Sequence, residues 1–360
     1  MEPSNTTTTF THKNKALLYV AFLLFLAGLF LASAEFALRK MGMKPWQMRE
    51  VNIQVEPGGR FFTKHPSLGY THIPGQFKVT LGSDYSFQAS HLPNTLRITH
   101  PLASYGGSSQ KPEIWVFGCS FTYGWSLNDE QTYPWLLQER LPEYEIINFG
   151  VNGYGTTHSL IQLRQALEST RPPKVIVLAY ADFHDERNTF GRVWRKSVAP
   201  MNKLGPLAQP YARLGTDGSL RYSLAEVEYT GFPLMSHSAL VHFLEGMWNR
   251  VEHKLHRSHQ VSEALVMEMA SLARKHDVKF VLASIAPDRR MLEFTKQNGI
   301  PGVDISVDIS ASEYNNLPHD SHPSAIANIK YADKLEPFLK NECLGTGTAN
   351  CTTSILPPAH

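Results

Sequence analysis

Short apolar runs alternate with amphipathic segments between residues 111 and 340. The apolar runs predict strands at Ile114–Phe117, Tyr144–Asn148, Val175–Tyr180, Lys279–Ala283 and Gly302–Ile305. Apolar positions at helical spacing predict helices at Tyr133–Arg140, Thr157–Glu168, Ser262–Lys275 and Ser324–Leu339. This alternation is typical of an α/β domain in which helices cover both faces of a parallel sheet of about five strands.

The alternation is absent from two other parts of the chain. Residues 39–110 are rich in Gly, Pro, His and aromatic residues, and stretches such as Phe77–Leu81 alternate apolar with polar positions, which predicts a small β-rich segment before the main domain. A second irregular stretch near residues 193–258 interrupts the main domain. It is either a lid or wall for a substrate, or an excursion without a role. Residues 341–360 form a tail.

The N-terminus carries the longest apolar run. Residues 1–15 are polar and predicted to be disordered, whereas no charged residue lies between Ala16 and Ala34. A helix over residues 16–38 is long enough to cross a bilayer, so this segment is a retained anchor or a signal peptide. Its length favours an anchor, although Ala32-Ser33-Ala34 fits a cleavage site.

The charges beside this segment give no single orientation. More basic residues follow the segment than precede it, which by the positive-inside rule puts the main domain in the cytoplasm. The signal-like layout and two cysteines in the tail favour the opposite side, and we expect an extracytoplasmic domain. There, Cys343 and Cys351 form either a disulfide or two free thiols.

Composition excludes several classes of function. The 360-residue chain has a formal net charge of +2 and no long Lys/Arg run, so nucleic acid is not an expected partner. The 16 histidines show no His-Glu-x-x-His spacing, and we expect neither a metal nor an organic cofactor.

Candidate chemistry begins directly after the first expected strand of the main domain. Gly118-Cys119-Ser120 places a serine in a tight turn at the carboxyl end of that strand, where α/β folds present nucleophiles. About two hundred residues later come Asp320 and His322, candidates for the orienting acid and the base that a serine nucleophile needs. Alternatively, Asp320 is a helix cap and His322 a loop residue.

A glycine-rich loop, Asn148–Thr156, follows the next expected strand. Because glycine has no side chain, backbone N–H groups of such a loop can approach an oxyanion closely. The alternatives are a plain tight turn and a phosphate loop, but the latter lacks a Gly-Lys-Ser/Thr ending.

Taken together, these segments resemble the SGNH (GDSL-like) hydrolases over residues 111–339. The resemblance implies a flavodoxin-like three-layer α/β/α fold, with Ser120 as nucleophile, His322 as base and Asp320 as its partner. It also implies that the N–H groups of Ser120 and Gly153 bind the oxyanion. The anchor and β-rich segment look like those of bacterial envelope proteins that add or remove acyl groups on glycans.

Three positions depart from the family pattern. Cys119 replaces the usual Asp before the serine, and Asp-x-His replaces the commoner Asp-x-x-His, in which His319 would take the Asp position. The third departure is the missing oxyanion-binding asparagine of the third motif, where this chain has Ala179–Asn188.

Within that segment, several side chains compete for the role of the missing asparagine. An ionised Asp182 would repel the oxyanion, so His184 is the expected replacement donor, with Asn188 as the alternative; a site with two donors only is the third possibility. Cys119 is a rival nucleophile, but side chains of consecutive residues at a strand end point to opposite sides, and the resemblance selects Ser120.

The sequence thus predicts a membrane-anchored, extracytoplasmic serine esterase or O-acyltransferase acting on acyl esters, acetyl esters first, of glycans or related envelope molecules. The alternative is a non-catalytic glycan-binding or scaffolding protein on a degenerate SGNH domain. An α/β-hydrolase lipase fits less well, because Thr122 stands where Gly-x-Ser-x-Gly needs its second glycine.

Overall fold

A five-stranded parallel sheet forms the centre of the larger of two compact units in the computed structural model, which describes residues 12–48, 50, 52–105 and 110–345. Its strands are β6 (Glu113–Phe117), β7 (Glu145–Asn148), β8 (Val175–Tyr180), β11 (Lys279–Ser284) and β12 (Gly302–Asp304). They lie in the order β12-β11-β8-β6-β7, and every neighbouring pair is parallel. Counted along the chain this is the flavodoxin-like order 2-1-3-4-5, so the predicted fold class is confirmed.

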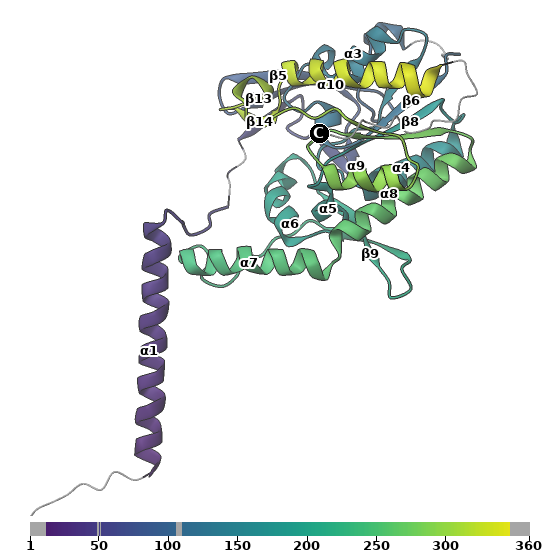
Figure 1. Ribbon diagram of the computed structural model, residues 1–360. Helices are drawn as coiled ribbons and strands as arrows, with labels where there is room; N and C mark the ends of the chain where they lie inside the picture. The colour runs from purple at the N-terminus through teal and green to yellow at the C-terminus, as the bar shows by residue number, and fades with distance from the viewer. Residues whose placement is uncertain (1–11, 49, 51, 106–109, 346–360) are drawn as a thin grey trace, which may run out of the picture. The chain divides into compact units, whose positions relative to one another are not determined.

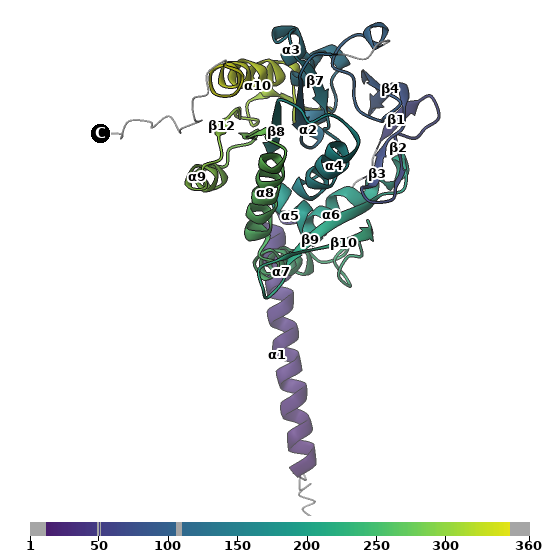
Figure 2. The ribbon, with the colours of Figure 1, turned by 90° about the vertical axis from the view of Figure 1, so that its right-hand side faces the viewer.

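Alternate strand residues pack against helices on opposite faces of the sheet. Ile114 and Val116 belong to the core under α3 (Tyr133–Arg140) and α10 (Ala325–Phe338). Trp115 and Phe117 belong to the core under α4 (Thr156–Ser169), α8 (Ser258–Lys275) and α9 (Arg289–Gln297). Figures 1 and 2 show these helices on the two sides of the sheet. Because both faces are covered, β6 and β8 read as continuous apolar runs in the sequence.

The segment before β6 is β-rich, as predicted. β1 (Ile53–Glu56), β4 (Gly75–Leu81) and β5 (Tyr85–His91) form an antiparallel sheet, and β2 (Phe62–His65) pairs with β3 (Gly69–His72). The core of this segment includes Tyr123, Trp125 and Tyr154, which belong to the segments that directly follow β6 and β7. The β-rich segment therefore packs against the edge of the main sheet where the predicted catalytic loops lie.

A buried ion pair fixes this junction. Arg97 Nε donates to Asp129 Oδ1 over 2.8 Å, and its side chain is fully buried. The remaining guanidinium donors reach the carbonyl oxygens of Tyr123, Gly124 and Leu127. Arg97 thus ties the β-rich segment to the loop that directly follows the predicted nucleophile.

The irregular stretch near 193–258 contains short elements of its own. It is preceded by α5 (His184–Asn188) and consists of α6 (Arg192–Val198), η3 (Ala199–Leu204), a hairpin of β9 (Ala208–Leu214) and β10 (Leu220–Glu226), and α7 (Ala239–Leu255). The remaining short elements are η1 (Leu102–Ser104), η2 (Asp129–Gln131), η4 (Ser312–Tyr314) and η5 (Leu339–Leu344).

The smaller unit comprises residues 1–49 and 230–251. Its helix α1 (His12–Lys40) is long and apolar enough to cross a membrane by length and composition, and its large apolar side chains are exposed. Near its end, Glu35 accepts hydrogen bonds from the backbone N–H groups of Ala239 and Leu240 and thereby caps α7. Residues 1–11, which make up most of the N-terminus predicted to be disordered, lie outside the described residues. Cys351 also lies outside them, and with it the predicted Cys343–Cys351 disulfide.

Candidate functional site

Ser120 follows the strand at which the sheet order reverses. After β6 the chain adds β7 on one side and β8 on the other, so the carboxyl end of β6 lies at the topological switch point. Ser120 opens the short helix α2 (Ser120–Tyr123), whose backbone N–H groups at its first turn lack intrahelical acceptors. A Cβ at Gly118 would lie 2.1 Å from Thr122 Oγ1, so this tight turn requires glycine.

The structure brings Ser120, His322 and Asp320 into one hydrogen-bonded chain. His322 Nε2 lies 2.9 Å from Ser120 Oγ, and His322 Nδ1 lies 2.5 Å from Asp320 Oδ1. Asp320 and His322 lie on β14 (Asp320–Pro323), which pairs with β13 (Asn315–Asn316) directly before α10. Because a carboxylate only accepts, Nδ1 carries the imidazole proton and Nε2 is left to accept the serine proton.

Trp125 extends this chain of hydrogen-bonded side chains, and sequence analysis did not predict its role. Its Nε1–H donates to Asp320 Oδ2 over 2.7 Å, while Asp320 Oδ1 also accepts from the His322 backbone N–H over 2.9 Å. Burial opposes ionisation of Asp320, but the bonds from His322 and Trp125 outweigh it, so the pKa of Asp320 is lowered. Both carboxylate oxygens are thereby fixed, and the acid stays charged beside the imidazole.

Gly153 lines the same cavity as Ser120, on the loop after β7. Its φ of +81° is in the left-handed region, and a Cβ there would lie 2.5 Å from Tyr70 Oη and 3.3 Å from the Trp194 ring. Tyr70 Oη in turn donates to the carbonyl oxygen of Asn152 over 2.7 Å. The loop is therefore fixed by the β-rich segment in a conformation that leaves no room for a side chain. That Gly153 and Ser120 N–H groups bind an oxyanion stays a prediction.

The candidates for a third donor lie elsewhere. His184 is fully buried, its Nδ1 lies 3.4 Å from Thr156 Oγ1, and it is not among the residues that line the Ser120 cavity. Burial lowers the pKa of His184 well below its usual value, so the ring is neutral. Asn188 uses its side chain on Thr157 N and Ser262 Oγ. The oxyanion role predicted for His184 is thus without a supporting contact in the described residues, and it stays a prediction.

Two other side chains named by the sequence have clear positions. Cys119 is fully buried, near the phenol groups of Tyr133 and Tyr331, and does not line the Ser120 cavity. His319 stacks on Tyr85 with ring centroids 5.0 Å apart and points to Asp84, so it does not replace Asp320 as partner of the base.

A cavity of about 200 Å³ opens at Ser120 and His322. Its walls are mostly apolar and come from the β-rich segment and from α6 and η3. Apart from Ser120, His322, Trp125 and the loop residues Asn152 and Gly153, the lining residues are Phe62, Tyr70, Arg187, Trp194, Ser197, Val198, Met201, Leu204 and Leu207. Part of the irregular stretch therefore lines the cavity, and its role as a wall for a substrate stays a prediction.

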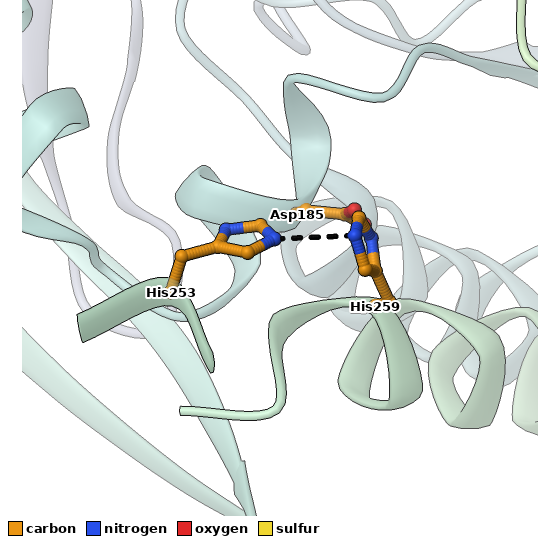
Figure 3. Close-up of side chains that lie close together, drawn as sticks. All are labelled: Asp185, His253 and His259. Atoms are coloured by element: carbon orange, nitrogen blue, oxygen red, sulfur yellow. Dashed lines mark hydrogen bonds and ion pairs between the residues drawn. The ribbon is translucent and has the colours of Figure 1, made fainter. Parts of the chain in front are cut away.

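Within the described residues, Asp185, His253 and His259 form a group that could hold a metal ion by geometry (Figure 3). None of the three is among the residues that line the Ser120 cavity. His253 Nε2 is 3.3 Å from His259 Nε2, and His259 Nδ1 bonds to Asp185 Oδ2. Arg290 lies 3.4 Å from the same oxygen, and Tyr180 Oη donates to the other over 2.7 Å. With these donors already on Asp185, the group is a polar network that needs no ion for its hydrogen bonding.

Comparisons with known proteins found no matching family model and no matching curated protein. Solved structures are similar at low identity. A member of the lipolytic protein G-D-S-L family from Veillonella parvula DSM 2008 is 9% identical, covering 61% of this chain and 94% of its own, with a TM-score of 0.36. A GDSL-like lipase from Bacteroides thetaiotaomicron VPI-5482 is 13% identical, covering 65% and 91%, with a TM-score of 0.36.

A psychrotrophic esterase from Pseudoalteromonas sp., in a structure inhibited by monoethylphosphonate, is 10% identical and covers 64% of this chain and 97% of its own, with a TM-score of 0.34. Scores this low add no weight to a functional assignment. The fold therefore rests on the strand order described above, and function rests on the geometry around Ser120.

Proposed function

We propose that this protein is an SGNH-type serine esterase or O-acyltransferase that works through an acyl-enzyme on Ser120. The single observation that carries the proposal is the hydrogen-bonded chain from Ser120 Oγ through His322 to Asp320, at the mouth of a cavity. A serine hydroxyl is a weak nucleophile at neutral pH, and this arrangement supplies both the base and the group that orients it.

The chemistry follows from these positions. His322 Nε2 takes the proton as Ser120 Oγ attacks the ester carbonyl, and Asp320 stabilises the imidazolium that forms. The oxyanion is stabilised by the N–H groups of Ser120 and Gly153. The imidazolium then protonates the departing alkoxide. In the second half, His322 activates either water, which gives hydrolysis, or an acceptor hydroxyl, which gives acyl transfer.

The cavity supports an ester whose acyl part is short and whose alcohol part remains outside. Its mostly apolar walls suit an acyl chain better than a sugar ring, and a volume of about 200 Å³ admits acetyl and longer groups. A second hollow of about 850 Å³ lies beyond Leu207, which lines both spaces, and its lining includes the charged residues Arg60, Lys64, Glu226 and Glu228. This hollow is a suitable place for a glycan or another polar envelope molecule.

We also propose that the protein is membrane-anchored with its catalytic domain outside the cytoplasm. α1 supplies the anchor, and α7, which Glu35 caps, carries exposed apolar residues on one face: Phe243, Leu244, Met247, Trp248 and Val251. Such a face suits a helix lying against the bilayer surface. Alkaline phosphatase fused to the C-terminus should be active in cells, because it folds only outside the cytoplasm; an inactive fusion present in normal amounts would contradict this orientation.

The enzymatic proposal is tested by hydrolysis of p-nitrophenyl acetate by the full chain in detergent. Ser120→Ala should abolish turnover, whereas Cys119→Ala, a matched change at the neighbouring residue, should retain it. Equal turnover in wild type and Ser120→Ala would contradict the proposal. Loss in Cys119→Ala alone would assign the nucleophile to the thiol, provided that both variants unfold at similar temperatures.

A further inference from the structure

Arg187 places a positive charge in the mostly apolar wall of the Ser120 cavity. Its guanidinium carbon lies 4.4 Å from the ring centroid of Phe183 and 4.4 Å from that of Trp194, so it is held between two aromatic faces. Nη1 donates to the carbonyl oxygen of Tyr154 over 2.9 Å. The side chain is thus held rigidly at the cavity and does not extend freely into solvent.

Arg187 makes no direct ion pair in the described part of the chain, although the Glu186 carboxylate is close enough to interact with its charge. No carboxylate there lies within salt-bridge distance of it, in contrast to Arg97, Arg164 and Arg290, which each have one. Its Nε is buried without a hydrogen-bond acceptor. The hydrogen bond of the side chain to a described residue is the one from Nη1 to Tyr154, which leaves Nη2 unused. Arg187 is half-buried, and its guanidinium keeps a hydrogen-bonding group that no carboxylate of the described residues occupies, which suits an anionic ligand.

We propose that Arg187 binds a carboxylate at the far end of the acyl group, so that the substrates are half-esters of short dicarboxylic acids. This inference rests on the proposed esterase or acyltransferase function. Arginine forms strong, charge-assisted hydrogen bonds to carboxylates, and Nη2, which is not among the buried atoms, provides the donor that faces a ligand. Stacking on Trp194 keeps the planar guanidinium oriented before a substrate binds.

The position of Arg187 indicates that the bound carboxylate belongs to the acyl part of the ester and not to the alcohol part. Arg187 stacks on the Trp194 ring, and two atoms of this ring lie 3.3–3.5 Å from where a Cβ of Gly153 would be. The Trp194 ring therefore lies between Arg187 and Gly153, the predicted oxyanion donor. The acyl carbonyl must sit at this donor, whereas the leaving alkoxide must face His322. A cavity of about 200 Å³ accommodates a four-carbon or five-carbon acid more readily than a glycan.

In hydrolysis, the bond between the acyl carbon and the ester oxygen breaks, the alcohol leaves with a proton from His322, and the hydroxyl of water ends on the acyl carbon. The products are the alcohol and a dicarboxylic acid. In transfer, an acceptor hydroxyl takes the place of water and receives the same acid-bearing acyl group. Neither route changes an oxidation state, and neither needs a further reactant.

Three esters of similar size test the proposal on the full chain in detergent. Monoethyl succinate carries its acid on the acyl side, ethyl butyrate is its neutral counterpart, and O-butyrylglycolate carries its acid on the alcohol side. We expect the wild type to have a higher kcat/KM for monoethyl succinate than for ethyl butyrate. A charge-assisted hydrogen bond contributes about 1.5–3 kcal/mol, so Arg187→Met should lower this preference by about 10–100-fold.

The controls separate recognition from structure. Arg187→Lys keeps the charge without the planar fork and should retain part of the preference. Arg140→Met, which removes an arginine paired with Asp333 on the helical surface, should leave the preference unchanged. If Arg187→Met lowers kcat/KM for monoethyl succinate and ethyl butyrate equally, Arg187 only supports the loop at Tyr154 and the proposal is wrong. If the wild type instead prefers O-butyrylglycolate to ethyl butyrate and Arg187→Met removes this preference, Arg187 binds a carboxylate on the alcohol part of the ester. That result would overturn the assignment to the acyl part.

Failure of this inference can be told apart from failure of the proposed function. A chain that hydrolyses ethyl butyrate through Ser120 but shows no Arg187-dependent preference is an esterase without this subsite. If no ester is hydrolysed, titration calorimetry of the Ser120→Ala protein with monoethyl succinate and with ethyl butyrate still tests whether Arg187 binds a carboxylate. The carboxylate subsite is supported if Ser120→Ala binds monoethyl succinate more tightly than ethyl butyrate and the double variant Ser120→Ala/Arg187→Met does not. Equal or undetectable binding of both esters to Ser120→Ala refutes it.

Discussion

Gly153→Ala tests most sharply how the loop after β7 is built for catalysis. The new Cβ would lie 2.5 Å from Tyr70 Oη and 3.3 Å from the Trp194 ring, in a backbone conformation with φ of +81°. An alanine in the left-handed region costs about 1–2 kcal/mol. For a domain of this size, that corresponds to a fall in Tm of about 2–8 °C.

The effect on turnover should exceed the effect on stability. The loop can relieve the contact with Tyr70 only by moving, and displacement of one oxyanion donor lowers kcat by about 10²–10³-fold. The assay is kcat for p-nitrophenyl acetate beside Tm by differential scanning calorimetry. The double variant Gly153→Ala/Tyr70→Phe lacks the Oη that the Cβ would meet, and its kcat should exceed that of Gly153→Ala alone. A Gly153→Ala protein with lowered Tm and wild-type kcat would refute the role of the Gly153 N–H.

Three further substitutions test the supports of the site. Asp320→Asn should lower kcat by about 10⁴-fold with little change in Tm, because an amide donor no longer fixes the tautomer that His322 needs. Trp125→Phe removes one hydrogen bond to the Asp320 carboxylate and should lower kcat by about 10–100-fold at unchanged KM; a wild-type kcat would show that the indole only fills space. Arg97→Met leaves Asp129 buried without its partner, so urea titration should show a loss of about 3–5 kcal/mol in the free energy of unfolding, and a loss below about 1 kcal/mol would contradict this reasoning.

The layers of the fold could be read from the sequence because burial on both faces leaves a strong local signal. β8 (Val175–Tyr180) is buried at every position, and its apolar run was predicted with the same bounds. The strand order follows from right-handed parallel connections and the position of the switch point, which short-range patterns do not determine. The β-rich segment was predicted only in kind, since its strand pairings depend on contacts with the main domain.

The site was predictable where a motif is local and unpredictable where a partner is distant. Ser120, Asp320 and His322 belong to short, recognisable sequence motifs, and the structure brings them together. Trp125 is 195 residues from Asp320 along the chain, and no spacing rule connects an indole to a carboxylate at that distance. The role proposed for Arg187 could not be predicted either, because the absence of a direct ion pair depends on how the described residues pack and leaves no pattern in the sequence.

The central claim, that Ser120 is a nucleophile activated by His322, is tested most directly by covalent labelling. The full chain in detergent is treated with a fluorophosphonate, which reacts with activated serines independently of the natural acyl group, and the modified peptide is located by mass spectrometry. The account predicts one adduct on Ser120, formed by the wild type and by Cys119→Ala, and strongly reduced in His322→Ala. No adduct on Ser120, or equal labelling in His322→Ala, would contradict it.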